Sequence, residues 1–113
     1  MMTRTNEPVY QGSALTTRLD ALPAWSATDG WLRREFTTDG WRSTMMLVNA
    51  IAFLAEAANH HPDVDLRYPH VRVTLTSHDA GGVTTRDIDL ARQVSAAAGE
   101  LGIPAAPARL SVA

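Results

Sequence analysis

The stretch from Met45 to Ala58 constrains the fold of this 113-residue chain more than any other segment. Its apolar side chains recur at helical spacing on two neighbouring faces. One face carries Leu47, Ile51, Leu54 and Ala58, and the other carries Met45, Val48, Ala52 and Ala55. A helix that is apolar over so much of its circumference must be covered on two sides. In a small domain one cover is the sheet, and we expect the other to be a second subunit.

This helix is predicted to run from about Gly40 to Asn59. Asp39 is a suitable N-cap, because its carboxylate can accept hydrogen bonds from the unpaired amides of the first turn. The apolar stretch is interrupted by Asn49 and Glu56, and it is too short to span a bilayer. We therefore expect no membrane segment.

Two hairpins are predicted, one on each side of the long helix. Upstream, an Asp29-Gly30 turn separates the aromatic-rich segments 25–27 and 31–37, which is a strong hairpin signal. Downstream, residues 63–68 and 71–76 alternate polar and apolar side chains, as half-buried strands do. A turn at Pro69-His70 separates these two strands, and Arg72 and Thr74 are expected on the solvated face of the second one.

Two further helices complete the predicted fold. Leucines at helical spacing over residues 13–22 indicate a short amphipathic helix that ends before Pro23. After a flexible connection over residues 79–82, Thr84 and Asp87 have the spacing of a capping box that opens the last helix. The order is therefore αββαββα, an α+β fold in which three helices pack on one face of a four-stranded antiparallel sheet.

The chain has the length of one domain. We interpret residues 1–12 as a flexible N-terminal arm, residues 13–103 as the domain and residues 104–113 as an irregular C-terminal tail. A net charge of −2 without a basic run argues against direct binding of nucleic acid. The chain contains no cysteine and its N-terminus lacks the apolar core of a signal peptide, so we expect a cytoplasmic protein.

Three histidines lie at junctions between predicted elements, where side chains reach the rim of a sheet. His60 and His61 follow the long helix, His78 ends the last strand, and Asp87 opens the last helix. Imidazole has an ordinary pKa of about 6.5, so converging histidines suit general acid and base catalysis. Each of these residues, taken alone, also has a purely structural interpretation. His60 could interact with the dipole at a helix C-terminus, and His61-Pro62 could simply end the helix. Asp87 could serve only as a capping carboxylate.

A metal site is an alternative interpretation of the same residues. His60, His61 and Asp79 are side chains of the types that bind zinc. Adjacent histidines seldom both aim at one ion, however, and the spacing matches no zinc signature. The metal-free interpretation is therefore preferred.

The wider pattern resembles the signature of the pterin-4a-carbinolamine dehydratase family. That signature has an acidic residue, three spacer residues, His-His-Pro, an aromatic residue after a short spacer, a histidine after nine intervening residues, and a later aspartate. The matching residues here are Glu56, His60-His61-Pro62, Tyr68, His78 and Asp87. The similarity extends over about residues 13–101, with Leu-Pro-x-Trp at 22–25, Arg-Glu-Phe at 34–36 and Arg-Asp-Ile-Asp-Leu-Ala at 86–91.

The resemblance implies a reaction and a role for each matching residue. The implied reaction converts 4a-hydroxytetrahydropterin to quinonoid dihydropterin and water, which recycles the cofactor of aromatic amino acid hydroxylases. His60 and His78 would exchange protons, His61 would bind or orient the substrate, and Asp87 would hold or polarise a histidine. The substrate-binding set would comprise His60, His61, Pro62, Ser77, His78, Asp79 and Ala80. The pterin is the substrate, so no cofactor is expected.

The resemblance also implies an oligomer, since family members form homodimers or homotetramers. Relatives on this fold include a dimerisation partner of a homeodomain transcription factor and assembly factors, so a non-catalytic binding role is the alternative function. The degenerate relatives generally lack the histidines that this chain retains. Many relatives carry tryptophan soon after His-His-Pro, where this chain has Val64 and Leu66. Among the tryptophans, Trp25 is the best candidate for a pocket edge.

Overall fold

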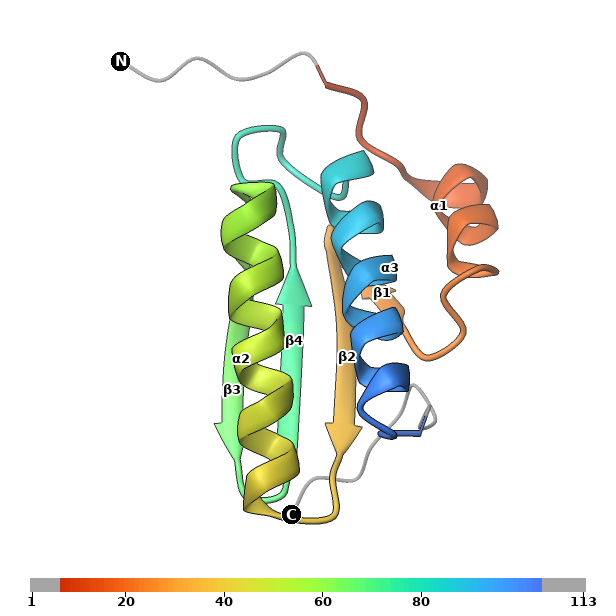
Figure 1. Cartoon of the computed structure of the whole chain (residues 1–113). Helices are drawn as coiled ribbons and strands as arrows, with labels where there is room; N and C mark the ends of the chain where they lie inside the picture. The colour runs from red at the N-terminus through yellow and green to blue at the C-terminus, as the bar shows by residue number, and fades with distance from the viewer. Residues whose placement is uncertain (1–6, 105–113) are drawn as a thin grey trace.

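The computed structural model describes residues 7–104. Helices and strands follow the order αββαββα (Figure 1), which confirms the predicted α+β fold. The elements are α1 (Gly12–Leu19), β1 (Ser26–Thr28), β2 (Trp31–Thr37), α2 (Trp41–Ala58), β3 (Asp63–Arg67), β4 (His70–Leu75) and α3 (Thr85–Glu100). No helix in the described part of the chain is both long and apolar enough to cross a membrane.

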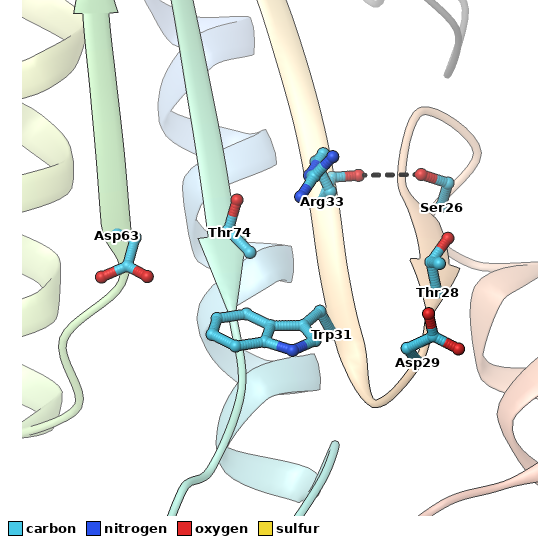
Figure 2. Close-up of a pocket in the computed structure, with 7 residues that line it drawn as sticks. All are labelled: Ser26, Thr28, Asp29, Trp31, Arg33, Asp63 and Thr74. Atoms are coloured by element: carbon cyan, nitrogen blue, oxygen red, sulfur yellow. Dashed lines mark hydrogen bonds between the residues drawn. The ribbon is translucent and has the colours of Figure 1, made fainter.

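The four strands form one antiparallel sheet in the order β1-β2-β4-β3. The central pair aligns Leu32 with Leu75 and Phe36 with Val71. Helices α2 and α3 lie side by side over the same face of this sheet, α2 above β3 and β4 and α3 above β2 (Figure 1). The opposite face of the sheet carries mostly polar side chains, together with Trp31, and it holds a cavity of about 390 Å³ (Figure 2).

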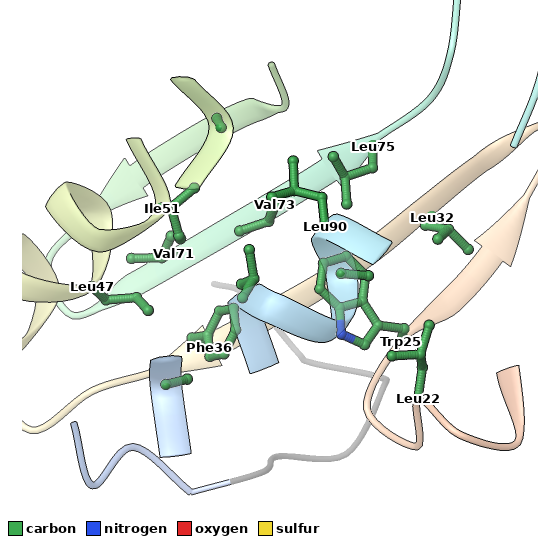
Figure 3. Packing of buried hydrophobic residues seen from close by; sticks show 14 of the residues in the cluster. Leu22, Trp25, Leu32, Phe36, Leu47, Ile51, Val71, Val73, Leu75 and Leu90 are labelled. Atoms are coloured by element: carbon green, nitrogen blue, oxygen red, sulfur yellow. The ribbon is translucent and has the colours of Figure 1, made fainter. Parts of the chain in front are cut away.

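The hydrophobic core fills the space between the sheet and these two helices (Figure 3). Alternate residues of β2 and β4 point into it, as the period of two in a strand requires. The fully buried members include Leu32, Phe36, Leu47, Ile51, Val71, Val73, Leu75, Leu90 and Val94. Burying each such side chain is worth roughly 1.5–3 kcal/mol, so the core holds the strand ends and helix ends in fixed positions.

The ends of two predicted elements differ from the sequence expectation. Helix α2 begins at Trp41 with Gly40 as its N-cap, so Asp39 lies one residue too early and accepts a hydrogen bond from the Ser43 hydroxyl instead. Helix α1 ends at Leu19, before the predicted end at residue 22. Pro23 is therefore not the residue that stops it.

Strand β3 is more exposed than its alternating pattern predicts. It is an edge strand that pairs only with β4, and of its five residues only Leu66 is partly buried. Val64 is 38% exposed. Polar and apolar residues do alternate along β3, but at this edge of the sheet α2 covers little of the apolar side chains.

Part of the predicted N-terminal arm is bonded to the domain. The amide of Tyr10 donates to the carbonyl of Val83 (2.8 Å), and the Tyr10 hydroxyl bonds to that of Thr85 (2.8 Å). Residues 1–6 and 105–113, which make up the rest of the arm and most of the predicted tail, lie outside the described residues.

Candidate functional site

A buried hydrogen bond between a histidine and a carboxylate joins the end of α2 to the start of α3. Asn59 takes a left-handed conformation (φ 51°) and ends α2, and the amide of His60 bonds back to the carbonyl of Ala55. His60 Nε2 lies 2.6 Å from Asp87 Oδ1. The side chains of His60 and Asp87 are 8% and 0% exposed, so the pair is almost entirely removed from water.

The Asp87 carboxylate accepts two further hydrogen bonds through Oδ2. One comes from the Ser77 hydroxyl (2.8 Å) and the other from the backbone amide of Thr84 (2.9 Å). Because the Ser77 hydroxyl donates its only proton to the carboxylate, the Thr84 hydroxyl, 2.8 Å away, must donate to Ser77. The predicted capping box is confirmed, and its carboxylate also holds a histidine.

This arrangement fixes which His60 nitrogen carries the proton. An ionised carboxylate only accepts hydrogen bonds, so the proton between His60 and Asp87 belongs to Nε2. Nδ1 of His60 makes no hydrogen bond to any residue of the described range 7–104. The neutral ring therefore has Nδ1 as the nitrogen that can take a proton.

His61 has a different environment from its neighbour. Its Nε2 lies 2.9 Å from Glu56 Oε1, and the two side chains are 58% and 83% exposed. A hydrogen bond between side chains so exposed contributes little stability. His61 is therefore free to move toward a ligand at the protein surface.

His78 lies just after the end of β4, next to an aromatic side chain. Its ring meets that of Trp31 edge to face, with centroids 5.5 Å apart and planes at 81°. The Thr76 hydroxyl donates to the carbonyl of Gly30 (2.7 Å), which ties the segment before His78 to the β1–β2 turn. Trp31 thus limits the orientations available to the His78 imidazole.

The loop that carries His78 is a closed turn rather than the flexible connection expected from its sequence. The carbonyl of Ser77 accepts from the amides of Ala80 (3.1 Å) and Gly81 (2.9 Å), and the amide of Ser77 donates to the carbonyl of Gly82 (2.9 Å). A Cβ atom on Gly82 would lie 2.7 Å from a methyl group of Val9. Glycine at this position allows the N-terminal segment to pack directly on the loop.

Asp79 is held by an arginine that the sequence analysis did not single out. Arg86 Nη2 lies 2.9 Å from Asp79 Oδ1, while its Nε lies 2.9 Å from Glu7 Oε1. The hydrogen bond from Arg86 lowers the pKa of the Asp79 carboxyl below its ordinary value. Arg86 was visible only as part of the Arg-Asp-Ile-Asp-Leu-Ala run, and the contact with Glu7 spans 79 residues.

The structure links some of the predicted site residues directly and separates others. His60, Ser77 and Asp87 belong to one hydrogen-bonded chain. Within the described residues, no hydrogen bond or ring contact joins His78 to His60 or His61. The histidines instead surround the end of the sheet where β3 begins and β4 ends.

Trp25 and Ala80, two further residues predicted to lie at the site, are both buried. Trp25 is only 4% exposed, and its indole N–H donates to Ser95 Oγ (2.8 Å), so it is a core residue and not a pocket edge. Ala80 is buried within the loop. Across residues 7–104 there is no group of three or more His, Asp or Glu side chains arranged to hold a metal ion.

Comparison with known proteins identifies the family. Residues 8–97 match the family model described as pterin 4 alpha carbinolamine dehydratase. The chain belongs to this family. The match spans the fold from α1 to all but the last residues of α3, and it includes all three histidines of the candidate site.

Bacterial members of the dehydratase family are close in sequence. A protein of Aquifex aeolicus, provisionally named a pterin-4-alpha-carbinolamine dehydratase, is 46% identical over 76 residues, which are 67% of this chain and 77% of the relative. A protein of Acidobacterium capsulatum with the same provisional name is 45% identical over 83 residues, 74% of this chain and 90% of the relative.

Solved structures of similar proteins share the fold. A protein of Brucella melitensis described as a transcriptional coactivator/pterin dehydratase superposes with a TM-score of 0.78 at 32% identity, over 81% of this chain and all of that one. A pterin dehydratase-like protein described as a RuBisCO assembly factor in the α-carboxysome superposes with a TM-score of 0.56 at 24% identity, over 66% of this chain and 87% of that one. The second likeness establishes the fold alone.

Proposed function

We propose that this chain dehydrates 4a-hydroxytetrahydropterins to quinonoid dihydropterins and water, through acid and base catalysis by histidine. Membership of the family indicates the reaction. The observation that carries the proposal is the His60–Asp87 pair, because a buried carboxylate that fixes one ring nitrogen leaves the other to exchange protons.

The reaction needs two proton transfers at neighbouring atoms. The C4a–O bond breaks as a proton reaches the hydroxyl, and water leaves. The N5–H bond gives up its proton, and its electrons form the N5=C4a double bond. Two imidazoles, His60 and His78, can supply and accept these protons, and such assistance is worth roughly 10²–10⁴-fold in rate. No electron leaves the substrate, so the step requires no redox cofactor.

The remaining site residues would bind the substrate. We propose that His61 and Pro62 contact the pterin at the end of α2, while backbone groups of the loop from Ser77 to Ala80 pair with the polar edge of the ring. Asp87 would act through His60 by holding its orientation. The biological role would be recycling of the pterin after an aromatic amino acid hydroxylase, in the cytoplasm and without direct binding of nucleic acid.

A stopped-flow assay of a freshly generated 4a-hydroxytetrahydropterin tests this proposal. We expect catalytic amounts of the protein to accelerate the absorbance change of dehydration well above the buffer rate. Chelation of metals should leave that rate unchanged. Loss of activity on chelation, with stoichiometric zinc in the purified protein, would instead support the metal-dependent alternative.

The second candidate function is a binding or assembly role, and one observation favours it. The outward face of α2 exposes Met46 (47%) and Phe53 (75%), which form an apolar surface in a single copy of the chain. We propose that a second copy of this chain covers it, giving a homodimer or homotetramer. A protein that forms a stable complex but leaves dehydration at the buffer rate would favour the non-catalytic role.

A further inference from the structure

Arg34 is a buried cation whose charge is not paired with any carboxylate of the described residues. Like Leu32 and Phe36 on the same strand, it points to the helix side of the sheet, and it is only 4% exposed. Within residues 7–104 its guanidinium forms a single hydrogen bond, from Nη1 to Ser95 Oγ (2.9 Å), and no ion pair. Its Nε is buried without a hydrogen-bond partner. An unpaired charge is costly to bury, so this position lacks the anion that would balance it.

The aromatic ring beside Arg34 compensates the charge only in part. The guanidinium carbon lies 4.1 Å from the centroid of the Phe36 ring. This contact satisfies one face of the guanidinium but none of its N–H donors. Burial lowers the pKa of Arg34, yet a guanidinium keeps its proton in proteins. The charge therefore stays in place.

The Ser95 hydroxyl adds a second free donor beside this cation. Its oxygen accepts from Arg34 Nη1 and also from Trp25 Nε1 (2.8 Å). A hydroxyl has two lone pairs and one proton, so only the proton is left. In the described part of the chain that proton has no acceptor. Arg34 and Ser95 therefore present donors without an acceptor, which is the pattern that an anion requires.

Both side chains line a cavity of about 190 Å³ between β2, α3 and the segment before β1. The rest of its wall has no polar side chain and consists of Ala21, Pro23, Ala24, Gly99 and Ile103. The cavity is smaller than the pockets that hold drug-sized molecules. It is also separate from the histidines, because Ser95 lies two turns beyond Asp87 on α3, about 12 Å along the helix axis.

We propose that this cavity binds a small aliphatic monocarboxylate, with the carboxylate on Arg34 and Ser95 and the carbon chain against the apolar wall. The planar guanidinium fork matches a carboxylate better than a spherical ion such as chloride. One cation balances one negative charge, so a phosphate dianion would bring an unpaired charge into a largely apolar cavity. The volume limits the chain of the ligand to a few carbon atoms.

An NMR titration with sodium butyrate tests this site, with sodium chloride and sodium phosphate at equal ionic strength as comparison salts. The indole N–H signal of Trp25 and the Nε–H signal of Arg34 report on the two donors. We expect both signals to shift saturably at millimolar butyrate, since a ligand of so few atoms binds weakly, and to shift little in the other salts. Butyrate should also raise the midpoint of thermal unfolding above its value in chloride, because it binds only the folded state.

Two variants with matched controls locate the binding. Arg34→Met removes the charge and should weaken butyrate binding about tenfold or more. Arg33→Met, at the neighbouring residue on the other face of the sheet (Figure 2), should leave the affinity within about twofold. Gly99→Leu should narrow the cavity and weaken binding while keeping both donors, and a Cβ at Gly99 meets no atom within 4 Å. Ala96→Leu, at an exposed position of α3 outside the cavity, is its control.

The outcome is independent of the dehydration assay. Saturable butyrate shifts that Arg34→Met and Gly99→Leu weaken would uphold the site whether or not the protein dehydrates pterins. The proposal would be overturned by a wild type that shows no saturation, by equal shifts in chloride or phosphate, or by unchanged affinity in both variants. Gly99→Leu decides alone if Arg34→Met fails to fold.

Discussion

His60 Nε2 and Asp87 Oδ1 lie 2.6 Å apart, although 27 residues separate them in the chain. The contact exists because α2 ends beside the first turn of α3 on the same face of the sheet (Figure 1). The same carboxylate caps α3 through the Thr84 amide. The helix start and the orientation of His60 therefore depend on a single side chain.

Asp87→Asn should abolish most of the activity while leaving the fold intact. The amide is similar in size but carries no charge, and it can present a donor to His60 in place of an acceptor. We expect kcat to fall by about 100-fold or more, because proton transfer by a correctly held imidazole contributes roughly 10²–10⁴-fold. Far-UV circular dichroism would check the fold. Asp89→Asn, on the exposed side of the same helix, is the control and should retain wild-type kcat.

Arg86→Gln should raise the pKa of Asp79, since the Arg86 hydrogen bond is the main cause of its lowering. The carbon-13 shift of the Asp79 carboxyl followed through acid pH would measure it. A carboxyl with a lowered pKa stabilises the fold above its unfolded-state pKa, and this contribution disappears as the pH falls through the folded-state pKa. The stability difference between wild type and variant should therefore be present at neutral pH and vanish in acid. Arg92→Gln, which breaks the exposed pair with Asp89, should leave the Asp79 titration unchanged.

Ser95→Ala should destabilise the fold more than its small size suggests. Ser95 Oγ accepts from Trp25 Nε1 (2.8 Å) and from Arg34 Nη1 (2.9 Å). Arg34 is 4% exposed, and burial lowers the pKa of its guanidinium. Removing the shared acceptor leaves two donors without a partner, so urea unfolding should show a loss of about 2 kcal/mol. Ser13→Ala, at an exposed site on α1, should cost under about 0.5 kcal/mol; equal losses for the two variants would contradict the role given to Ser95.

Met46→Glu should dissociate the oligomer without unfolding the subunit. A charge placed on the outward face of α2 would have to be buried at the interface without a partner, whereas in a single copy it stays in water. Light scattering should show a fall to the mass of one chain, with unchanged circular dichroism. Gln93→Glu adds the same charge to the exposed side of α3 and should leave the mass unchanged. A wild-type protein that is already monomeric at micromolar concentrations would refute the oligomer.

Much of the fold could be predicted because its signals are local. The two hairpins, the helix over residues 41–58 and the capping box of Thr84 and Asp87 each depend on residues close together in the sequence. The resemblance to the dehydratase family, and not the capping box, made Asp87 a candidate site residue that would hold a histidine. Neither signal could reveal that this histidine is His60, because that requires knowing how α2 and α3 pack.

The features that were missed depend on contacts across the fold. Trp31, and not Trp25, borders a cavity, because side chains alternate along a strand and β2 pairs with β4 in a register that turns Trp31 outward. The Glu7–Arg86 contact depends on where the N-terminal segment crosses the loop after β4. Thr74 was expected to be merely solvated, and only the pairing with Asp63 makes it part of a cavity wall.

We propose that His60 and His78 share the proton transfers of dehydration. The most direct test is the pH dependence of carbinolamine dehydration by wild type, His60→Ala, His78→Ala and the double variant, followed by stopped-flow absorbance. We predict a wild-type rate that falls on both sides of neutrality, because one imidazole must be charged while the other is neutral. Each single variant should be strongly impaired, and the double variant should approach the buffer rate. A double variant with the wild-type rate and an unchanged pH profile would contradict the account.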